Sequence, residues 1–263
     1  MKIFITSCDG RLNYAKKVQE MMKDSPYEYV FVYGKGNKHM LDPHIEIDEQ
    51  EAYENLPSKT YFLVKYFMEN HNDSQLLKMN DDTFLDFTKL RQYESAIQDY
   101  IGFFHDYELG RFNKFFHWYK VTNPAFKVFK RQVPLKYAEG AMYILSRKAC
   151  ERILQKGREF FRSLPETYLG EDLKVGLTLD CPDIVKWDIK HPNELNYEVT
   201  TDFMSIHPVS LLMFDKLKAA KTNEQKMEIL RRYCSLNENA LRIDFLTRTE
   251  RELIGKSKDG DVS

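Results

Sequence analysis

The sequence predicts a Rossmann-like α/β fold in which a mostly parallel central sheet is flanked by helices. Short runs of β-branched and aromatic residues alternate with stretches whose apolar residues recur every three or four positions. This alternation is typical of βαβ units, which build parallel sheets with helices on both faces. The 263 residues suffice for one large domain. We expect it to span residues 1–210, with residues 211–263 forming a helical extension and a loose tail.

The first half of the chain contains four predicted strands. They are expected at residues 2–6, 28–33, 45–48 and 75–79, with helices at residues 13–22 and 58–69 between them. The glycines of Gly34-Lys35-Gly36 lack the third glycine of a dinucleotide-binding motif and indicate a turn. A further helix is expected from about Asp86 to Tyr100, because its apolar residues share one side. These residues are Phe87, Leu90, Tyr93, Ile97 and Ile101.

Later segments continue the α/β pattern. Residues 141–145 (AMYIL) are a predicted strand, and Ser146 is a suitable cap for a helix that reaches about Lys156. Another helix is expected directly after Gly170.

Composition and charge exclude several functional classes. The formal net charge is −1, whereas dedicated nucleic-acid-binding proteins usually carry a basic excess. No apolar run reaches the roughly 18 residues of a membrane-spanning helix, and the first residues do not resemble a signal peptide. The four cysteines show no CxxC spacing, which favours reduced structural thiols. We therefore expect a soluble or cytoplasmic protein, or a domain of a longer polypeptide.

The segment between Gly110 and Lys136 combines seven Lys or Arg residues with seven aromatic residues and contains no acid. It is a candidate wall of a binding site, in which Trp118 or Tyr119 stacks on a ring of the ligand. Two alternatives remain: a partly buried segment whose charged ends reach water, and a module that binds single-stranded nucleic acid.

An acidic turn directly follows the strand expected at residues 75–79. Its residues are Asn80, Asp81 and Asp82. Ligands of open α/β sheets bind outside the carboxyl ends of the strands, and oxygen donors suit Mg²⁺ or Mn²⁺. The sequence therefore indicates a metal-assisted diphosphate site here; the alternative is a solvated turn.

Five segments in the same order resemble the β1,3-galactosyltransferase and Fringe-like superfamily, glycosyltransferase family 31, whose fold is of the GT-A type. KMNDDTF resembles its K-x-D-D-D-x-F segment. The others are residues 48–66, which contain ENLPSKT, residues 137–153, which contain YAEGAMYILS, residues 169–179, which contain GEDLKVG, and Ser205-Ile206-His207. The resemblance covers residues 48–207; the first 47 residues match only loosely.

The resemblance implies a set of site residues. Asp82 would bind Mn²⁺, or Mg²⁺, together with His207, and Asp81 would lie near the ribose or the sugar. Asn80 replaces the first Asp of the family's turn, which retains an oxygen ligand but removes a charge. Without the resemblance, His207 would be interpreted as a structural histidine.

The resemblance also assigns Asp172 as the general base, with Glu171 as the alternate. Both could instead stabilise a helix start, where acids are common. Lys59 and Gly140 match the family's segments at the donor. The basic and aromatic segment is then a candidate wall of the acceptor site, with Trp118 or Tyr119 stacking on a sugar ring. Thr6, Ser7 and Arg11 are candidate nucleotide contacts because they follow the first strand.

The implied activity is an inverting, metal-dependent transfer of a sugar from a UDP-sugar to a hydroxyl of a glycan or glycoprotein. The expected sugar is galactose and the expected linkage is β. Asp172 would accept the proton of the hydroxyl, and the metal would neutralise the departing UDP. The alternative is a catalytically silent protein of the same fold that binds a nucleotide sugar or a glycan.

Overall fold

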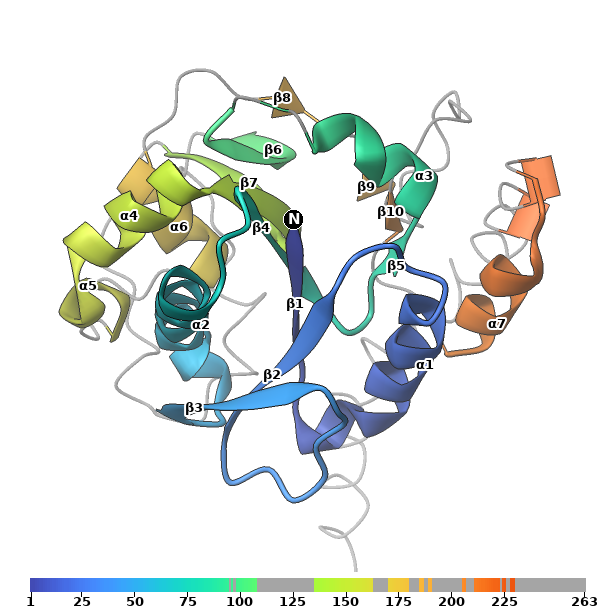
Figure 1. Cartoon of the computed structure of the whole chain (residues 1–263), viewed down its shortest axis with the longest axis horizontal. Helices are drawn as coiled ribbons and strands as arrows, with labels where there is room; N and C mark the ends of the chain where they lie inside the picture. The colour runs from blue at the N-terminus through green and yellow to red at the C-terminus, as the bar shows by residue number, and fades with distance from the viewer. Residues whose placement is uncertain are drawn as a thin grey trace, which may run out of the picture.

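A twisted sheet forms the centre of the protein (Figure 1). The structure is a computed structural model that describes residues 1–94, 96, 98–107, 135–162, 170–179, 185–186, 189–190, 205–206, 211–222, 224–225 and 228–229. Within these residues, seven strands pair in the order β3-β2-β1-β4-β7-β6-β8. Their bounds, in that order, are His44–Gln50, Tyr29–Lys35, Lys2–Thr6, Gln75–Asn80, Leu135–Ser146, Tyr100–Tyr107 and Val185–Lys186.

The strands β3, β2, β1 and β4 are mutually parallel, whereas β7 runs antiparallel to both β4 and β6. The four parallel strands therefore end at one edge of the sheet. The start of β7 reaches the same edge, because Met142 pairs with Met79 near the end of β4. A smaller described sheet contains β5 (Phe84–Leu85), β10 (Ser205–Ile206) and β9 (Ile189–Lys190).

Alternating strand residues build a core on each face of the sheet. Ile3 and Ile5 of β1 pack with Val18 of α1 (Leu12–Met22), whereas Phe4 packs on the opposite face with Phe67 of α2 (Leu56–Asn70). The second face is also covered by α4 (Arg147–Lys156), α5 (Arg158–Arg162) and α6 (Glu171–Leu179). The predicted α/β fold with a mostly parallel sheet is confirmed.

Local sequence signals explain where several elements begin. Ser146 Oγ accepts a hydrogen bond from the backbone N–H of Ala149 at 3.1 Å, so it caps α4 as expected. Short 3-10 turns at Asp9–Arg11 and Tyr53–Asn55 lead into α1 and α2. The turn after β2 uses Gly36, whose φ of 94° favours glycine.

One expected helix is wrong. The helix predicted from Asp86 to Tyr100 is limited to α3 (Phe87–Leu90) and a 3-10 turn at Arg91–Tyr93. The strand β6 then begins at Tyr100. Tyr100 and Ile101 are buried in the cores on opposite faces of the sheet, which is the two-residue period of a strand.

The expected C-terminal extension begins with α7 (Leu211–Ala219), which lies beside α1 (Figure 1). Leu217 is buried, and Lys218 Nζ lies 2.8 Å from Glu20 Oε1 of α1. The rest of the predicted extension lies largely outside the described residues. Within the described part of the chain, no helix combines the length and the apolar character needed to cross a membrane.

Candidate functional site

A cavity of about 430 Å³ lies where the parallel strands end. This volume falls within the range of typical small-molecule sites. Its lining includes seven of the residues predicted from the sequence to bind the donor or a metal. They are Thr6, Ser7, Arg11, Lys59, Asn80, Asp81 and Asp82.

The acidic turn is held by residues that follow β1. Ser7 Oγ donates a hydrogen bond to Asp81 Oδ2 at 2.6 Å, and Arg11 Nε lies 2.5 Å from Asp81 Oδ1. Arg11 Nη2 lies 2.6 Å from Asp82 Oδ2, so one guanidinium pairs with both carboxylates. The ring of Tyr14 lies under this guanidinium at 4.6 Å. Burial raises the pKa of Asp81 to about 6, although the charge of Arg11 favours its ionised form.

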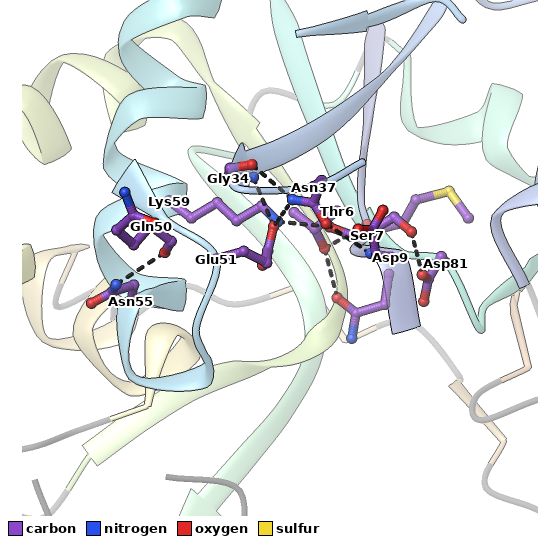
Figure 2. A network of polar contacts seen from close by, with 12 residues as sticks. Thr6, Ser7, Asp9, Gly34, Asn37, Gln50, Glu51, Asn55, Lys59 and Asp81 are labelled. Atoms are coloured by element: carbon purple, nitrogen blue, oxygen red, sulfur yellow. Dashed lines mark hydrogen bonds and ion pairs between the residues drawn. The ribbon is translucent and has the colours of Figure 1, made fainter. Parts of the chain in front are cut away.

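A second network fixes the cavity wall next to the turn (Figure 2). Lys59 reaches from α2 and donates hydrogen bonds to the carbonyl of Ser7 at 2.8 Å and to both carboxylate oxygens of Glu51. Glu51 Oε2 also accepts from the backbone N–H of Gly34 at 2.7 Å and from Asn37 Nδ2 at 2.9 Å. Burial lowers the pKa of Lys59, while the charge of Glu51 opposes that shift.

Lys78 lies two residues before Asn80 on β4 and joins the acidic turn to β7 and α6. Its Nζ donates to Asn80 Oδ1 at 2.9 Å and to the carbonyl of Gly140. The same Nζ lies 3.2 Å from Glu171 Oε2 at the start of α6. Lys78 is only 2% exposed, so this buried ammonium is compensated by the buried carboxylate.

The two candidate bases, Glu171 and Asp172, have different surroundings. The carboxylate of Glu171 is buried, pairs with Lys78 and accepts a hydrogen bond from the Tyr143 hydroxyl. Asp172 is partly exposed, and its Oδ2 accepts from the backbone N–H of Gly140 at 3.3 Å. Burial, reinforced by the charge of Glu171, raises the pKa of Asp172 to about 6. Asp172 is therefore the better placed of the two to exchange a proton with a substrate.

Gly140 allows the close approach of β7 and α6. A Cβ at this position would lie 3.1 Å from Glu171 Oε2 and 3.5 Å from the Cβ of Asp172. The first distance is tighter than ordinary van der Waals contact. A side chain at residue 140 would therefore require the carboxylate of Glu171 to shift from its present position.

The donor chemistry of the turn fits a hard divalent cation, because Asp81 and Asp82 offer carboxylate oxygens at the cavity. Among the described residues, no group of three His, Cys, Asp or Glu side chains is arranged as a metal site. A cation at Asp82 would therefore need ligands from the substrate or from His207, which lies outside the described residues.

Trp118 and Tyr119 also lie outside the described residues, as does nearly all of the basic and aromatic segment. Glu51 and Lys78 are site residues to which the sequence reasoning gave no role. A site role for Lys78 could have been predicted, because residues 78 and 80 of one strand lie on the same face as each other. Glu51 had none, because its partners Gly34 and Lys59 are assembled only by the fold.

A comparison with solved structures identifies the type of fold. One similar structure is that of the galactosyltransferase LgtC in complex with donor and acceptor sugar analogues. The alignment covers 88% of this chain and 95% of LgtC. The identity is 10% and the TM-score 0.51, so the likeness shows a shared GT-A glycosyltransferase fold.

Two further solved structures align with lower TM-scores. The first is an active-site mutant of LgtC with 10% identity and a TM-score of 0.45, whose alignment covers 87% of this chain and 95% of the mutant. The second is a glycosyltransferase involved in glycosylation of the major capsid of PBCV-1. It has 11% identity and a TM-score of 0.46, and the alignment covers 83% of this chain and 98% of that protein. No curated protein sequence matches the chain significantly.

The sequence profile of the Galactosyltransferase family matches residues 37–186, which is more than half of the chain. The protein belongs to this family. The match contains Lys59, the acidic turn, Gly140 and Asp172. Thr6, Ser7, Arg11 and His207 lie outside it, so the family match does not bear on their proposed roles.

Proposed function

We propose that the protein is an inverting, metal-dependent glycosyltransferase that moves galactose from UDP-galactose to a glycan hydroxyl and forms a β-linkage. One observation carries the proposal: the acidic turn, Gly140 and Asp172, which are far apart in the sequence, converge around Lys78 at the carboxyl edge of the sheet. Family membership supports glycosyl transfer, and the donor, metal, linkage and stereochemistry are our proposal.

In the proposed reaction, UDP-galactose binds in the cavity with its diphosphate near Asp82. A divalent cation held by Asp82 and His207 would neutralise charge on the leaving UDP. Asp172 accepts the proton of the acceptor hydroxyl as that oxygen attacks the anomeric carbon from the face opposite the UDP. Glu171 positions this base, because Lys78 and Tyr143 hold its carboxylate.

The raised pKa of Asp172 suits this role. A base with a pKa of about 6 is largely ionised at neutral pH and accepts a proton more readily than an ordinary aspartate. Asp172 also lies on α6, whose helix start is fixed by contacts on both β4 and β7. The base is thus built on a rigid element, as orientation of a reacting group requires.

The proposal is tested by measuring UDP release from a panel of UDP-sugars, with Mn²⁺ and with EDTA, for the wild type and Asp82→Ala. We expect slow release from UDP-galactose that requires both Mn²⁺ and Asp82. Binding of a UDP-sugar without release, even when glycan acceptors are supplied, would favour the silent binding protein. Absence of binding for all UDP-sugars would rule out the proposed function.

A further inference from the structure

The side-chain amide of Asn80 has an orientation that its neighbours determine. Lys78 Nζ lies 2.9 Å from Asn80 Oδ1, and Thr6 Oγ1 lies 3.0 Å from the same atom. An ammonium group has three N–H donors and no acceptor, so the amide atom that faces it must be the oxygen. The amide oxygen is therefore engaged inside the protein by two hydrogen bonds.

The nitrogen of the same amide is consequently directed away from Lys78. Asn80 is partly exposed and lines the cavity, and its Nδ2 makes no hydrogen bond to the described part of the chain. The acidic turn thus offers the cavity an N–H donor beside the carboxylates of Asp81 and Asp82. This changes our expectation from the sequence, in which Asn80 retained an oxygen ligand for a metal.

We propose that Asn80 donates a hydrogen bond to the diphosphate of the nucleotide-sugar donor. The proposal rests on the proposed function, because it specifies a contact to that donor. Diphosphate oxygens only accept hydrogen bonds, whereas the hydroxyls of the ribose and sugar and the uracil ring also donate them. A site that presents an N–H donor at the cavity complements the acceptor-only, anionic part of the ligand.

Electrostatics point in the same direction. A carboxylate at residue 80, as in the family's turn, would place a third negative charge next to Asp81 and Asp82 and would repel a diphosphate. Arg11 already pairs with Asp81 and Asp82. With the neutral Asn80, the turn therefore needs less help from a divalent cation to bind the diphosphate than a turn with a carboxylate at residue 80 would need.

The test measures dissociation constants for UDP and for uridine in the presence of EDTA. Asn80→Asp preserves the shape of the side chain, replaces the N–H donor by an acceptor and adds one negative charge. Asn80→Ala removes the donor without adding charge. The matched control is Asn72→Asp, which adds the same charge at an exposed position just before β4, at the opposite end of that strand.

We expect Asn80→Asp to weaken UDP binding by about tenfold or more, the range of a lost hydrogen bond to a charged group, and to change uridine binding by less than about twofold. Asn80→Ala should weaken UDP binding less than Asn80→Asp, and Asn72→Asp should leave it unchanged. Thermal unfolding of each variant verifies that the proteins are folded.

Three results contradict the inference while the proposed function stands. They are undiminished UDP binding by Asn80→Asp, equal losses for UDP and uridine, and wild-type binding of UDP that requires Mn²⁺ absolutely. If the wild type binds neither UDP nor any UDP-sugar, with or without Mn²⁺, the proposed function fails as well.

Discussion

At the scale of single residues, the proposed reaction depends on the ionised carboxylate of Asp172. We predict that Asp172→Asn lowers the rate of transfer by about 10²–10⁴-fold, the usual contribution of a general base, and leaves the dissociation constant of UDP nearly unchanged. In the wild type, kcat/KM should rise with pH through about 6 as Asp172 loses its proton. Steady-state kinetics as a function of pH measure both effects.

The exposed Asp24 on the surface after α1 provides a matched control, because Asp24→Asn removes the same charge far from α6. Its kinetics and pH profile should equal those of the wild type. An Asp172→Asn variant that retains full transfer activity would remove Asp172 from the role of base, and Glu171→Gln would then be the variant to compare.

The raised pKa of Asp172 also leads to a prediction about stability. Its pKa is raised to about 6 in the folded protein, so the folded state binds its proton more tightly than the unfolded state. This favourable contribution is complete below the ordinary aspartate value near pH 4 and is lost as the pH rises through about 6. Asp172→Asn should therefore be more stable than the wild type at pH 8, by about 1–2 kcal/mol after allowance for solvent screening.

Urea denaturation at pH 4 and pH 8 measures this difference. The advantage of Asp172→Asn should grow from the lower to the higher pH. An advantage that stays constant over this range would show that the ionisation of Asp172 does not reduce stability.

At the scale of elements, Lys78 holds β4, β7 and α6 together through Asn80, Gly140 and Glu171. Removing one member of a buried ion pair leaves the other charge uncompensated. We predict that Lys78→Met destabilises the protein by about 3–5 kcal/mol. Adding Glu171→Gln should recover part of that loss, because the unpaired carboxylate is then replaced by a neutral amide.

Chemical denaturation of the wild type, both single variants and the double variant gives the coupling energy between the two residues. Lys65→Met is a suitable control, because Lys65 is an exposed lysine of α2 whose ion pair with Glu69 is long, at 3.8 Å. Additive effects of Lys78→Met and Glu171→Gln would contradict a direct interaction.

Some secondary-structure elements could be predicted from the sequence and others could not. Strands such as Lys2–Thr6 and Gln75–Asn80 were predictable because short apolar runs end at clear polar turns. The segment 86–100 was predicted as one helix because Phe87, Leu90 and Tyr93 have helical spacing. The helical part nevertheless ends at Tyr93, and pairing with β7 imposes a strand from Tyr100. Such tertiary pairing has no local signal.

The site was predictable to a similar degree. The acidic turn and Gly170-Glu171-Asp172 were recognisable from local motifs, and the fold brings both to Lys78. The pairing of Arg11 with Asp81 and Asp82, and of Glu51 with Lys59, joins residues that only the fold brings together. These pairs decide the charge and the hydrogen-bonding character of the cavity, and spacing along the chain does not encode them.

At the scale of the whole molecule, the sheet has two edges with different roles. The cavity, the acidic turn and the start of α6 lie at the carboxyl edge of the parallel strands, whereas apolar cores cover both faces of the sheet. This division follows from the parallel topology, in which strand after strand ends at the same edge. Function in this family member is therefore expected at that edge.

The most direct test of the account is a crystal structure of the protein with UDP and Mn²⁺. We predict that the nucleotide occupies the cavity lined by Thr6, Lys59 and Asp81, with its diphosphate next to Asp82 and within hydrogen-bonding distance of Asn80. Asp172 should face the side of the cavity where the donor sugar would extend. A nucleotide bound at another surface, for example at the opposite edge of the sheet near Tyr29 and His71, would contradict the central claim.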